Sequence, residues 1–318
     1  MQALIDFDGA PVFAIPARAD YPGFRGCEGM LIEGPQGWGE FCPPRSGSDL
    51  LAARWLTSAI EGSTVGWPDP IRGRVPVAVA VPAVSPERAN AIVTDSGCRA
   101  ADVVLTGEPA DAARLEAVRD VLGPQGSIRG VAAAAWDVDT AAEAITRLNT
   151  AAGGLEFVQQ PCVTAGELAA LRRRIDVPVA VDVSDLSSAG LAMSEVADIV
   201  VLDVAPLGGV RRALRFAEKC ELPYVVSGVG QTSIGLAGGL ALAGVLPDLA
   251  FACGLGSAAA LAGDIVPAAR SLLTDDGYLP VAPMAAAPDP ARVAEFTVDD
   301  PERVAWWRAK LKVAKELL

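Results

Sequence analysis

The stretch ADIVVLDVAPLGGVRRAL, residues 197–214, contains a strand, a loop and the start of a helix in succession. Its apolar run 199–202 is typical of a strand buried in a parallel sheet, and the glycine pair precedes an amphipathic helix. Asp203 stands where the strand opens into the loop. A buried charge is unfavourable unless it is paired or bound to a metal. Asp203 is therefore either an active-site residue or a strand-end carboxylate that faces water or caps the next turn.

The same strand–helix unit recurs along the chain from residue 75 onward. Eight short apolar runs, each followed by a polar turn and a helical pattern, occupy residues 75–81, 101–106, 127–133, 155–160, 177–183, 198–204, 223–228 and 249–256. Eight parallel strands that alternate with helices predict an α/β fold of the (β/α)8 (TIM-like) barrel type. A doubly wound open sheet is the alternative, although no GxGxxG follows the first strand.

The residues before this repeat have a different pattern. Residues 1–17 (MQALIDFDGAPVFAIPA) alternate like a hairpin, and residues 29–41 (GMLIEGPQGWGEF) predict a second hairpin with a tight turn. Residues 48–62 (SDLLAARWLTSAIEG) follow as an amphipathic helix. The sequence thus predicts a small α+β capping domain in front of the barrel.

The predicted domains are a cap at 1–74 and a barrel at 75–284. We expect the C-terminal segment 285–318, which ends in a helical pattern, to pack back against the cap or the outside of the barrel. Trp306 and Trp307 in this segment are expected to be packing residues.

Composition limits the classes of partner. The chain carries 26 basic and 39 acidic residues, a net charge of −13, which argues against nucleic acid or an anionic membrane as a partner. The sequence has no apolar run long enough to span a membrane without charges or helix breakers, and no basic N-terminal region of a secretion signal. We therefore expect a cytoplasmic protein that acts on a small molecule; whether it forms a homo-oligomer is left open.

The cysteine and histidine content narrows the chemistry further. None of the six cysteines forms a CxxC pair, and we interpret them as small core residues in a reducing compartment. The sequence contains no histidine, so the usual general base, the usual zinc ligand and a Ser-His triad are all missing.

Active sites of (β/α)8 barrels lie at the C-terminal ends of the strands. The residues predicted there are Asp102, Val104, Val131, Ala133, Gln159, Asp182, Asp203 and the segment 228–231. Asp182 and Asp203 end consecutive strands, so they could share a proton, whereas Asp102 lies across the barrel. Hard-cation sites usually draw ligands from adjacent strands, so the three carboxylates do not favour a metal site.

Four segments of the chain resemble the sequences of one known family. The segments GWGEF (37–41), 158–184, 200–220 and 232–256 resemble o-succinylbenzoate synthases of the actinobacterial type, in the enolase superfamily, and the resemblance extends from about residue 24 to the end of the chain. It implies a capping domain and a (β/α)8 barrel. It also implies two lysines that flank the substrate and three carboxylates that hold Mg²⁺, which stabilises an enediolate formed by proton abstraction.

The positions that match the family's catalytic residues mostly carry other side chains. Asp182 alone corresponds to a family metal ligand, the aspartate of the fifth strand, and its neighbouring glutamate is replaced by Val183. The remaining replacements are Asp102 and Val104 for the Lys-x-Lys pair, Val131 and Ala133 for the aspartate and asparagine of strand three, Gln159 for the glutamate of strand four and Asp203 for the lysine of strand six. We therefore expect no metal, no cofactor and no magnesium-dependent dehydration.

Two interpretations of different classes follow. In the first, the barrel is repurposed as a metal-independent cyclase, isomerase or lyase for a largely apolar small molecule of the natural-product type. Its predicted catalytic residues are Asp203, Asp182, Asp102 and Gln159, and its predicted substrate-binding residues are Val104, Val131, Ala133, Val183, Gly228, Gly230 and Gln231. In the second, the chain is a non-catalytic pseudoenzyme that binds a ligand or a protein. A magnesium-dependent synthase of menaquinone biosynthesis is a further alternative.

Overall fold

A closed barrel of eight parallel strands forms the larger part of the structure, a computed structural model that describes residues 5–184, 191–228 and 230–318. The strands pair in chain order, and β11 pairs with β4 to close the ring. They are β4 (Arg74–Val81), β5 (Ala100–Val104), β6 (Ser127–Val131), β7 (Phe157–Gln159), β8 (Val179–Asp182), β9 (Ile199–Asp203), β10 (Tyr224–Ser227) and β11 (Cys253–Gly256). The predicted (β/α)8 barrel is confirmed.

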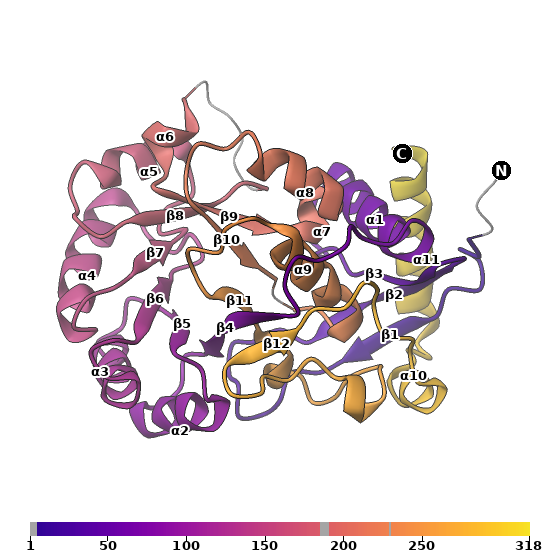
Figure 1. Cartoon of the computed structure of the whole chain (residues 1–318), viewed down its shortest axis with the longest axis horizontal. Helices are drawn as coiled ribbons and strands as arrows, with labels where there is room; N and C mark the ends of the chain where they lie inside the picture. The colour runs from indigo at the N-terminus through magenta and orange to yellow at the C-terminus, as the bar shows by residue number, and fades with distance from the viewer. Residues whose placement is uncertain (1–4, 185–190, 229) are drawn as a thin grey trace.

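Helices surround this barrel on the outside (Figure 1). They are α2 (Pro86–Ser96), α3 (Ala110–Leu122), α4 (Val138–Ala151), α5 (Ala165–Arg172), α6 (Met193–Val196), α7 (Val204–Leu207), α8 (Val210–Ala217) and α9 (Ser233–Val245). A short strand, β12 (Tyr278–Pro280), adds to β4 in the antiparallel direction. Two 3₁₀ turns, η1 (Ser257–Ala260) and η2 (Ala268–Arg270), lie between β11 and β12. No helix of the described residues is both long and apolar enough to cross a membrane.

Side chains alternate between the inside and the outside of the barrel, as the pleat of a strand requires. On β9, Val200 and Leu202 pack against the surrounding helices. Ile199 and Val201 belong instead to an apolar cluster shared with β7, β8 and β10, which fills the interior. Asp203, the next residue of this inward series, therefore stands at the C-terminal end of the barrel.

The cap is a three-stranded antiparallel sheet covered by a helix. Its strands are β1 (Val12–Ile15), β2 (Cys27–Gly34) and β3 (Gly37–Phe41), and the helix is α1 (Asp49–Thr64). The hairpin predicted over 29–41 is confirmed, because β2 and β3 pair down to Gly34 opposite Gly37.

The hairpin predicted within residues 1–17 is wrong for the described residues 5–17. β1 pairs with β2, with Val12 opposite Met30, rather than with an earlier strand. The Asp6 carboxylate accepts hydrogen bonds from the backbone N–H groups of Asp8 and Gly9, so the chain turns where an extended strand was expected.

The C-terminal segment packs back against the cap, as expected. It contains α10 (Pro290–Phe296) and α11 (Pro301–Glu316), and α11 lies beside α1 (Figure 1). Trp307 is 1% exposed in the core of the cap, and its indole N–H donates to Glu28 Oε1 at 2.8 Å. Trp306 packs against the same core, under the Arg45 guanidinium. The predicted domain bounds themselves stay a prediction.

The cap touches the barrel at the end where the strands finish. α1 contacts α7, which follows β9, and β3 contacts α9, which follows β10. The Glu61 carboxylate of α1 also accepts hydrogen bonds from the backbone N–H groups of Val210 and Arg211, at the start of α8. The cap thus stands over part of the C-terminal face of the barrel.

Candidate functional site at the barrel mouth

A cavity of about 420 Å³ opens at the C-terminal ends of β6, β7 and β8, where barrels of this class have their active sites. This volume suits a small organic molecule. Of the predicted site residues, four line the cavity together: Val131, Ala133, Gln159 and Asp182. The other lining residues are Ala134, Gln160 and Val163.

The polar side chains of this cavity form a connected chain of hydrogen bonds. Gln159 Nε2 donates to Asp182 Oδ2 at 3.0 Å. The backbone N–H of Asp182 donates to Gln160 Oε1 at 3.1 Å, and Gln160 Nε2 donates to the Cys162 carbonyl at 3.2 Å. Gln159 therefore holds the Asp182 carboxylate, and the next residue, Gln160, holds the backbone of Asp182. Gln160, the last residue of the predicted strand 155–160, was not predicted as a site residue; its role rests on a bond to the Asp182 backbone, which the sequence pattern does not show.

Backbone strain concentrates at the same cavity. Ala133, Ala134 and Gln160 have φ values of 50°, 60° and 45°, and Asp276 is the fourth non-glycine residue with a positive φ in the described part of the chain. Such conformations cost of order 1 kcal/mol each and persist where surrounding contacts enforce them. Here the Ala134 N–H donates to the Gln160 carbonyl at 2.6 Å, which ties the two loops together. The mouth between β6 and β8 thus has a fixed shape.

Asp203 ends β9 and begins α7. Its Oδ1 accepts a hydrogen bond from the Ala205 N–H at 3.3 Å, so the side chain is the N-cap of this short helix. This geometry matches the capping alternative considered for Asp203. Asp203 is not among the described residues that line the cavity of Asp182, and the proton sharing between these two carboxylates stays a prediction.

Asp102 lies deeper in the barrel, beside a buried arginine. Arg129 on β6 is 1% exposed, and its Nη1 is 3.4 Å from Asp102 Oδ1. The same guanidinium donates to Glu156 Oε2 at 2.6 Å and to the Ala252 carbonyl at 2.8 Å, and it lies over the Phe157 ring. Burial raises the pKa of Asp102, although the charge and the hydrogen bond of Arg129 act to lower it.

The other predicted substrate-binding residues have contacts of their own outside the cavity lining. Among the described lining residues, none is Val104, Val183, Gly228, Gly230 or Gln231. Gln231 is 3% exposed, and a side chain built at Gly228 would come within 3.4 Å of its Oε1. Val104 accepts a hydrogen bond from Arg114 through its carbonyl, and Val183 donates to the Val201 carbonyl. Their role in binding substrate stays a prediction.

The donors at the mouth do not fit the magnesium ion that the resemblance implies. Mg²⁺ takes six oxygen ligands in a near-ideal octahedron. Asp182 supplies the carboxylate at the end of β8, while Val131 and Gln159 end the two preceding strands, and the amide of Gln159 presents a donor to Asp182. Within the described residues, three or more metal-ligating side chains gather in the cap and not at the mouth.

Comparison with known proteins identifies the relatives of this chain. Residues 85–286 match the family described as enolase C-terminal domain-like, and residues 12–63 match the enolase N-terminal domain-like family. The chain is 46% identical to the o-succinylbenzoate synthase of Thermobifida fusca, with 95% of each chain covered. It is 42% identical to the o-succinylbenzoate synthase of Mycolicibacterium smegmatis, with 93% of this chain and 92% of the relative covered.

Solved structures share the fold of this chain. The 2-chloromuconate cycloisomerase of Rhodococcus opacus superposes with a TM-score of 0.75 over 91% of this chain and 98% of its own, at 19% identity. The muconate lactonizing enzyme of Pseudomonas putida gives 0.71 over 92% and 99%, at 18% identity. At these identities the likeness concerns the fold alone. The resemblance drawn from the sequence is confirmed by the curated relatives.

Proposed function

This chain belongs to the o-succinylbenzoate synthase family of the enolase superfamily, and we propose that it is a divergent member that works without a metal. Its barrel mouth would bind a largely apolar small molecule and isomerise or cyclise it. The observation that carries this proposal is the shaped cavity in which a single carboxylate, Asp182, is oriented by Gln159 among Val131 and Ala133.

The charged groups on which the family's reaction depends, the metal ligands and the two lysines, are mostly replaced in this chain. An enediolate needs a strong electrophile, and the donors around Asp182 do not fit Mg²⁺. The lysine positions carry Asp102, Val104 and Asp203, so no cationic acid/base pair flanks the cavity. Asp203 in place of a lysine also reverses the charge that an anionic substrate would meet. These changes favour an uncharged substrate over the family's anionic one.

The residues present support a proton transfer within one molecule. Asp182 would accept a proton from one atom of the substrate and return it to another, so an isomerisation or ring closure is balanced without a further reactant. Gln159 holds Oδ2 of this carboxylate, which orients it toward the cavity lining. The strained loop at Ala133 and Ala134 would keep the substrate in one pose, which supplies proximity.

A second candidate function is ligand binding without chemistry. Two of the three predicted acidic catalytic residues have structural partners: Asp203 caps α7, and Asp102 pairs with Arg129. This observation favours a pseudoenzyme that retains the cavity alone. The two functions differ in whether a bound compound is converted.

The first experiment is an o-succinylbenzoate synthase assay on the family's cyclohexadiene-carboxylate substrate, with and without saturating Mg²⁺. We expect no product above the uncatalysed rate in either condition. Metal-dependent turnover at an ordinary enzymatic rate would contradict the proposal, and the chain would then be a working synthase with ligands other than those at the family positions.

The second experiment separates binding from catalysis. A panel of uncharged cyclic and polyunsaturated compounds is screened by thermal shift against the full chain, and each hit is incubated and analysed for products. We expect Val131→Phe, which fills the cavity, to abolish binding, whereas Val65→Phe on the surface leaves it unchanged. Asp182→Asn should keep binding and lower turnover by about 100- to 10,000-fold. Hits that bind at the mouth without conversion would support the pseudoenzyme.

A further inference from the structure

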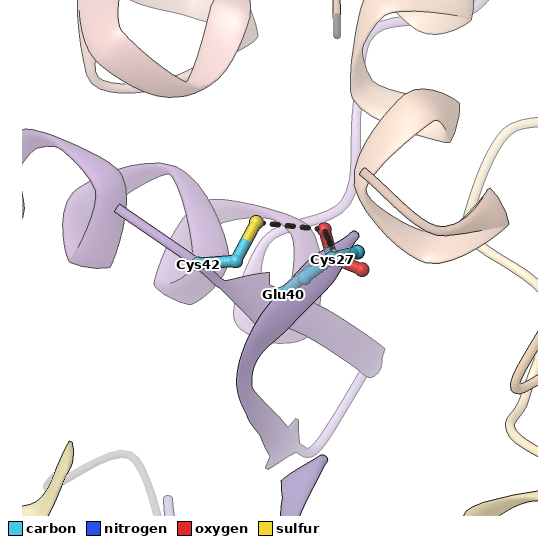
Figure 2. Close-up of side chains that lie close together, drawn as sticks. All are labelled: Cys27, Glu40 and Cys42. Carbon is cyan, nitrogen blue, oxygen red and sulfur yellow. Dashed lines mark hydrogen bonds between the residues drawn. The ribbon is translucent and has the colours of Figure 1, made fainter. Parts of the chain in front are cut away.

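Three side chains with metal-binding atoms meet inside the cap, away from the barrel mouth. Cys27 begins β2, Glu40 lies on β3, and Cys42 follows β3 directly. Leu31 is opposite Glu40 in the sheet, which places Gly29 opposite Cys42. A side chain at Gly29 would come within 2.6 Å of Cys42 Cβ, so the glycine leaves the space in which the two cysteines approach each other diagonally. Figure 2 shows the Cys42 sulfur bonded to the Glu40 carboxylate, with Cys27 close to the same carboxylate.

The spacing of the three ligand atoms is that of a small tetrahedral site. Cys42 Sγ is 3.0 Å and Cys27 Sγ is 3.8 Å from Glu40 Oε1, and all three ligand atoms lie within 4.8 Å of one another. Zinc bonds of about 2.3 Å to sulfur and 2.0 Å to oxygen imply sulfur–oxygen separations of about 3.5 Å and sulfur–sulfur separations of about 3.8 Å in a tetrahedron. Side-chain adjustments of less than an ångström would therefore suffice to close the site.

The site is closed to solvent and has no internal cation. Cys27, Glu40 and Cys42 are 1%, 5% and 8% exposed. In the described part of the chain, no lysine or arginine lies within ion-pair distance of Glu40. Burial raises the pKa of Glu40 to about 7 and that of Cys42 well above its usual value. A buried carboxylate between two thiols is poorly stabilised until a cation joins it.

The carboxylate is also oriented from outside the cluster. Thr232, the N-cap of α9, bonds to Glu40 Oε2 through its hydroxyl, and its backbone N–H donates to the same oxygen at 3.2 Å. Such contacts fix the direction of a ligating carboxylate. Glu40 Oε1 is left on the side of the two sulfurs.

We propose that Cys27, Glu40 and Cys42 form a structural site for a thiophilic divalent cation, Zn²⁺ in the first instance. Thiolate sulfur with one carboxylate oxygen is a zinc-type ligand set, and a closed site without an open face is typical of structural rather than catalytic zinc. Binding would release the thiol protons, and the carboxyl proton when present, to solvent, and the Thr232 hydroxyl, which contacts Glu40, would complete four protein ligands. The ion would fasten β2 and β3 to each other and, through Thr232, to α9.

The test uses the full chain, stripped of metal with a chelator under reducing conditions and titrated with Co²⁺. We expect one equivalent to bind, with the visible absorption of tetrahedral cobalt and a near-ultraviolet thiolate-to-cobalt band, and Zn²⁺ to displace it. Zinc should also raise the melting temperature. A chain without the thiolate band, or one that binds cobalt substoichiometrically, would overturn the proposal; the cluster would then be a core contact of a protonated carboxyl group and two thiols.

Variants decide whether these residues are the ligands. Cys27→Ser and Cys42→Ser should each lower zinc affinity by at least about 100-fold and remove the cobalt band, while Cys98→Ser, at a buried cysteine elsewhere, changes neither. Circular dichroism establishes that each variant is folded. If a ligand variant does not fold, alkylation of Cys27 and Cys42 in the unmodified chain is followed in a urea concentration that opens the cap, where stoichiometric zinc should slow the reaction at these two cysteines and leave the rate at Cys98 unchanged. A band that survives in the double variant would mark an adventitious ion only.

Discussion

The barrel mouth and the cluster of Cys27, Glu40 and Cys42 in the cap are two polar sites that differ in their exposure and in their ligating atoms. At the mouth, Asp182 is a single carboxylate in an open cavity, held by amide side chains. In the cap, Glu40 lies between two thiols in a closed space with no opening to substrate. The family's magnesium site belongs at the mouth, yet the described residues gather three metal-ligating side chains in the cap instead. The metal site that we propose therefore follows from the residues present and not from the position that the fold favours.

The largest expected effect concerns Arg129 and Asp102 below the barrel mouth, which we expect to stabilise the fold and not to act on a substrate. Arg129→Met should lower the free energy of unfolding by about 3–5 kcal/mol, because it leaves Asp102 buried without its partner. Urea denaturation measures this change. Arg174→Met is the control, since the Arg174–Asp139 pair is exposed and should contribute less than about 1 kcal/mol. Equal changes in the free energy of unfolding for the two substitutions would show that the buried pair contributes no more to stability than the exposed one.

The difference between the two sites should disappear if carboxylates are added at the mouth so that it binds a metal. Val131→Asp with Gln159→Glu adds two carboxylates to Asp182 at the ends of three adjacent strands. We expect this double variant to bind Mn²⁺ with a dissociation constant of about 1 mM, a binding free energy of about −4 kcal/mol, and the unmodified chain to bind none at the mouth. Electron paramagnetic resonance of free Mn²⁺ measures it. If the unmodified chain binds equally well at the mouth, our conclusion about its donors is wrong.

A smaller effect is expected from the strained loop at the mouth. Ala134→Gly removes the side chain that disfavours a φ of 60°, so the free energy of unfolding should rise, by up to about 1 kcal/mol. Ala142→Gly in α4 is the matched control and should be destabilising by a similar amount. Thermal melts compare the two. A loss of stability in both variants would mean that the alanine conformation is not strained.

The smallest expected effect is a dependence of the free energy of unfolding on pH. The pKa of Asp102 is raised in the folded protein above its ordinary value of 3.8, so the folded state holds this proton more tightly than the unfolded state. Its contribution to stability is full below about pH 4 and is lost as pH rises through the folded pKa. The stability of the unmodified chain relative to Asp102→Asn, measured by urea denaturation, should therefore fall as the pH rises above about 4. If the free energies of unfolding of the unmodified chain and of Asp102→Asn changed with pH in parallel, the raised pKa of Asp102 would be contradicted.

The fold was predictable because its pattern is local. The apolar run and glycine pair of 197–214 became β9, α7 and α8, within a few residues of the expected bounds. The early hairpin failed because one side chain, Asp6, captures two backbone N–H groups and turns the chain. Hydrophobic alternation does not register such a side chain-to-backbone bond.

The sites were less predictable because their partners are distant in the sequence. The resemblance located Gln159 and Asp182, but Arg129 looks like any polar residue of a strand, and its partners Asp102 and Glu156 are each 27 residues away. Cys27 and Cys42 are likewise unrelated in spacing. Only the pairing of β2 with β3 across Gly29 brings them together.

The bond between Trp307 and Glu28 joins residues 279 positions apart. On the ribosome, the strands of the cap are therefore made long before the helix that completes their core. The barrel units emerge in between, each with its neighbour close behind it. The core of the cap is completed only once α11 has been made, and until then its apolar strands are exposed to other nascent chains. A stop codon before α11 would leave the barrel strands and helices in place and would remove Trp307 and Leu311 from the core of the cap.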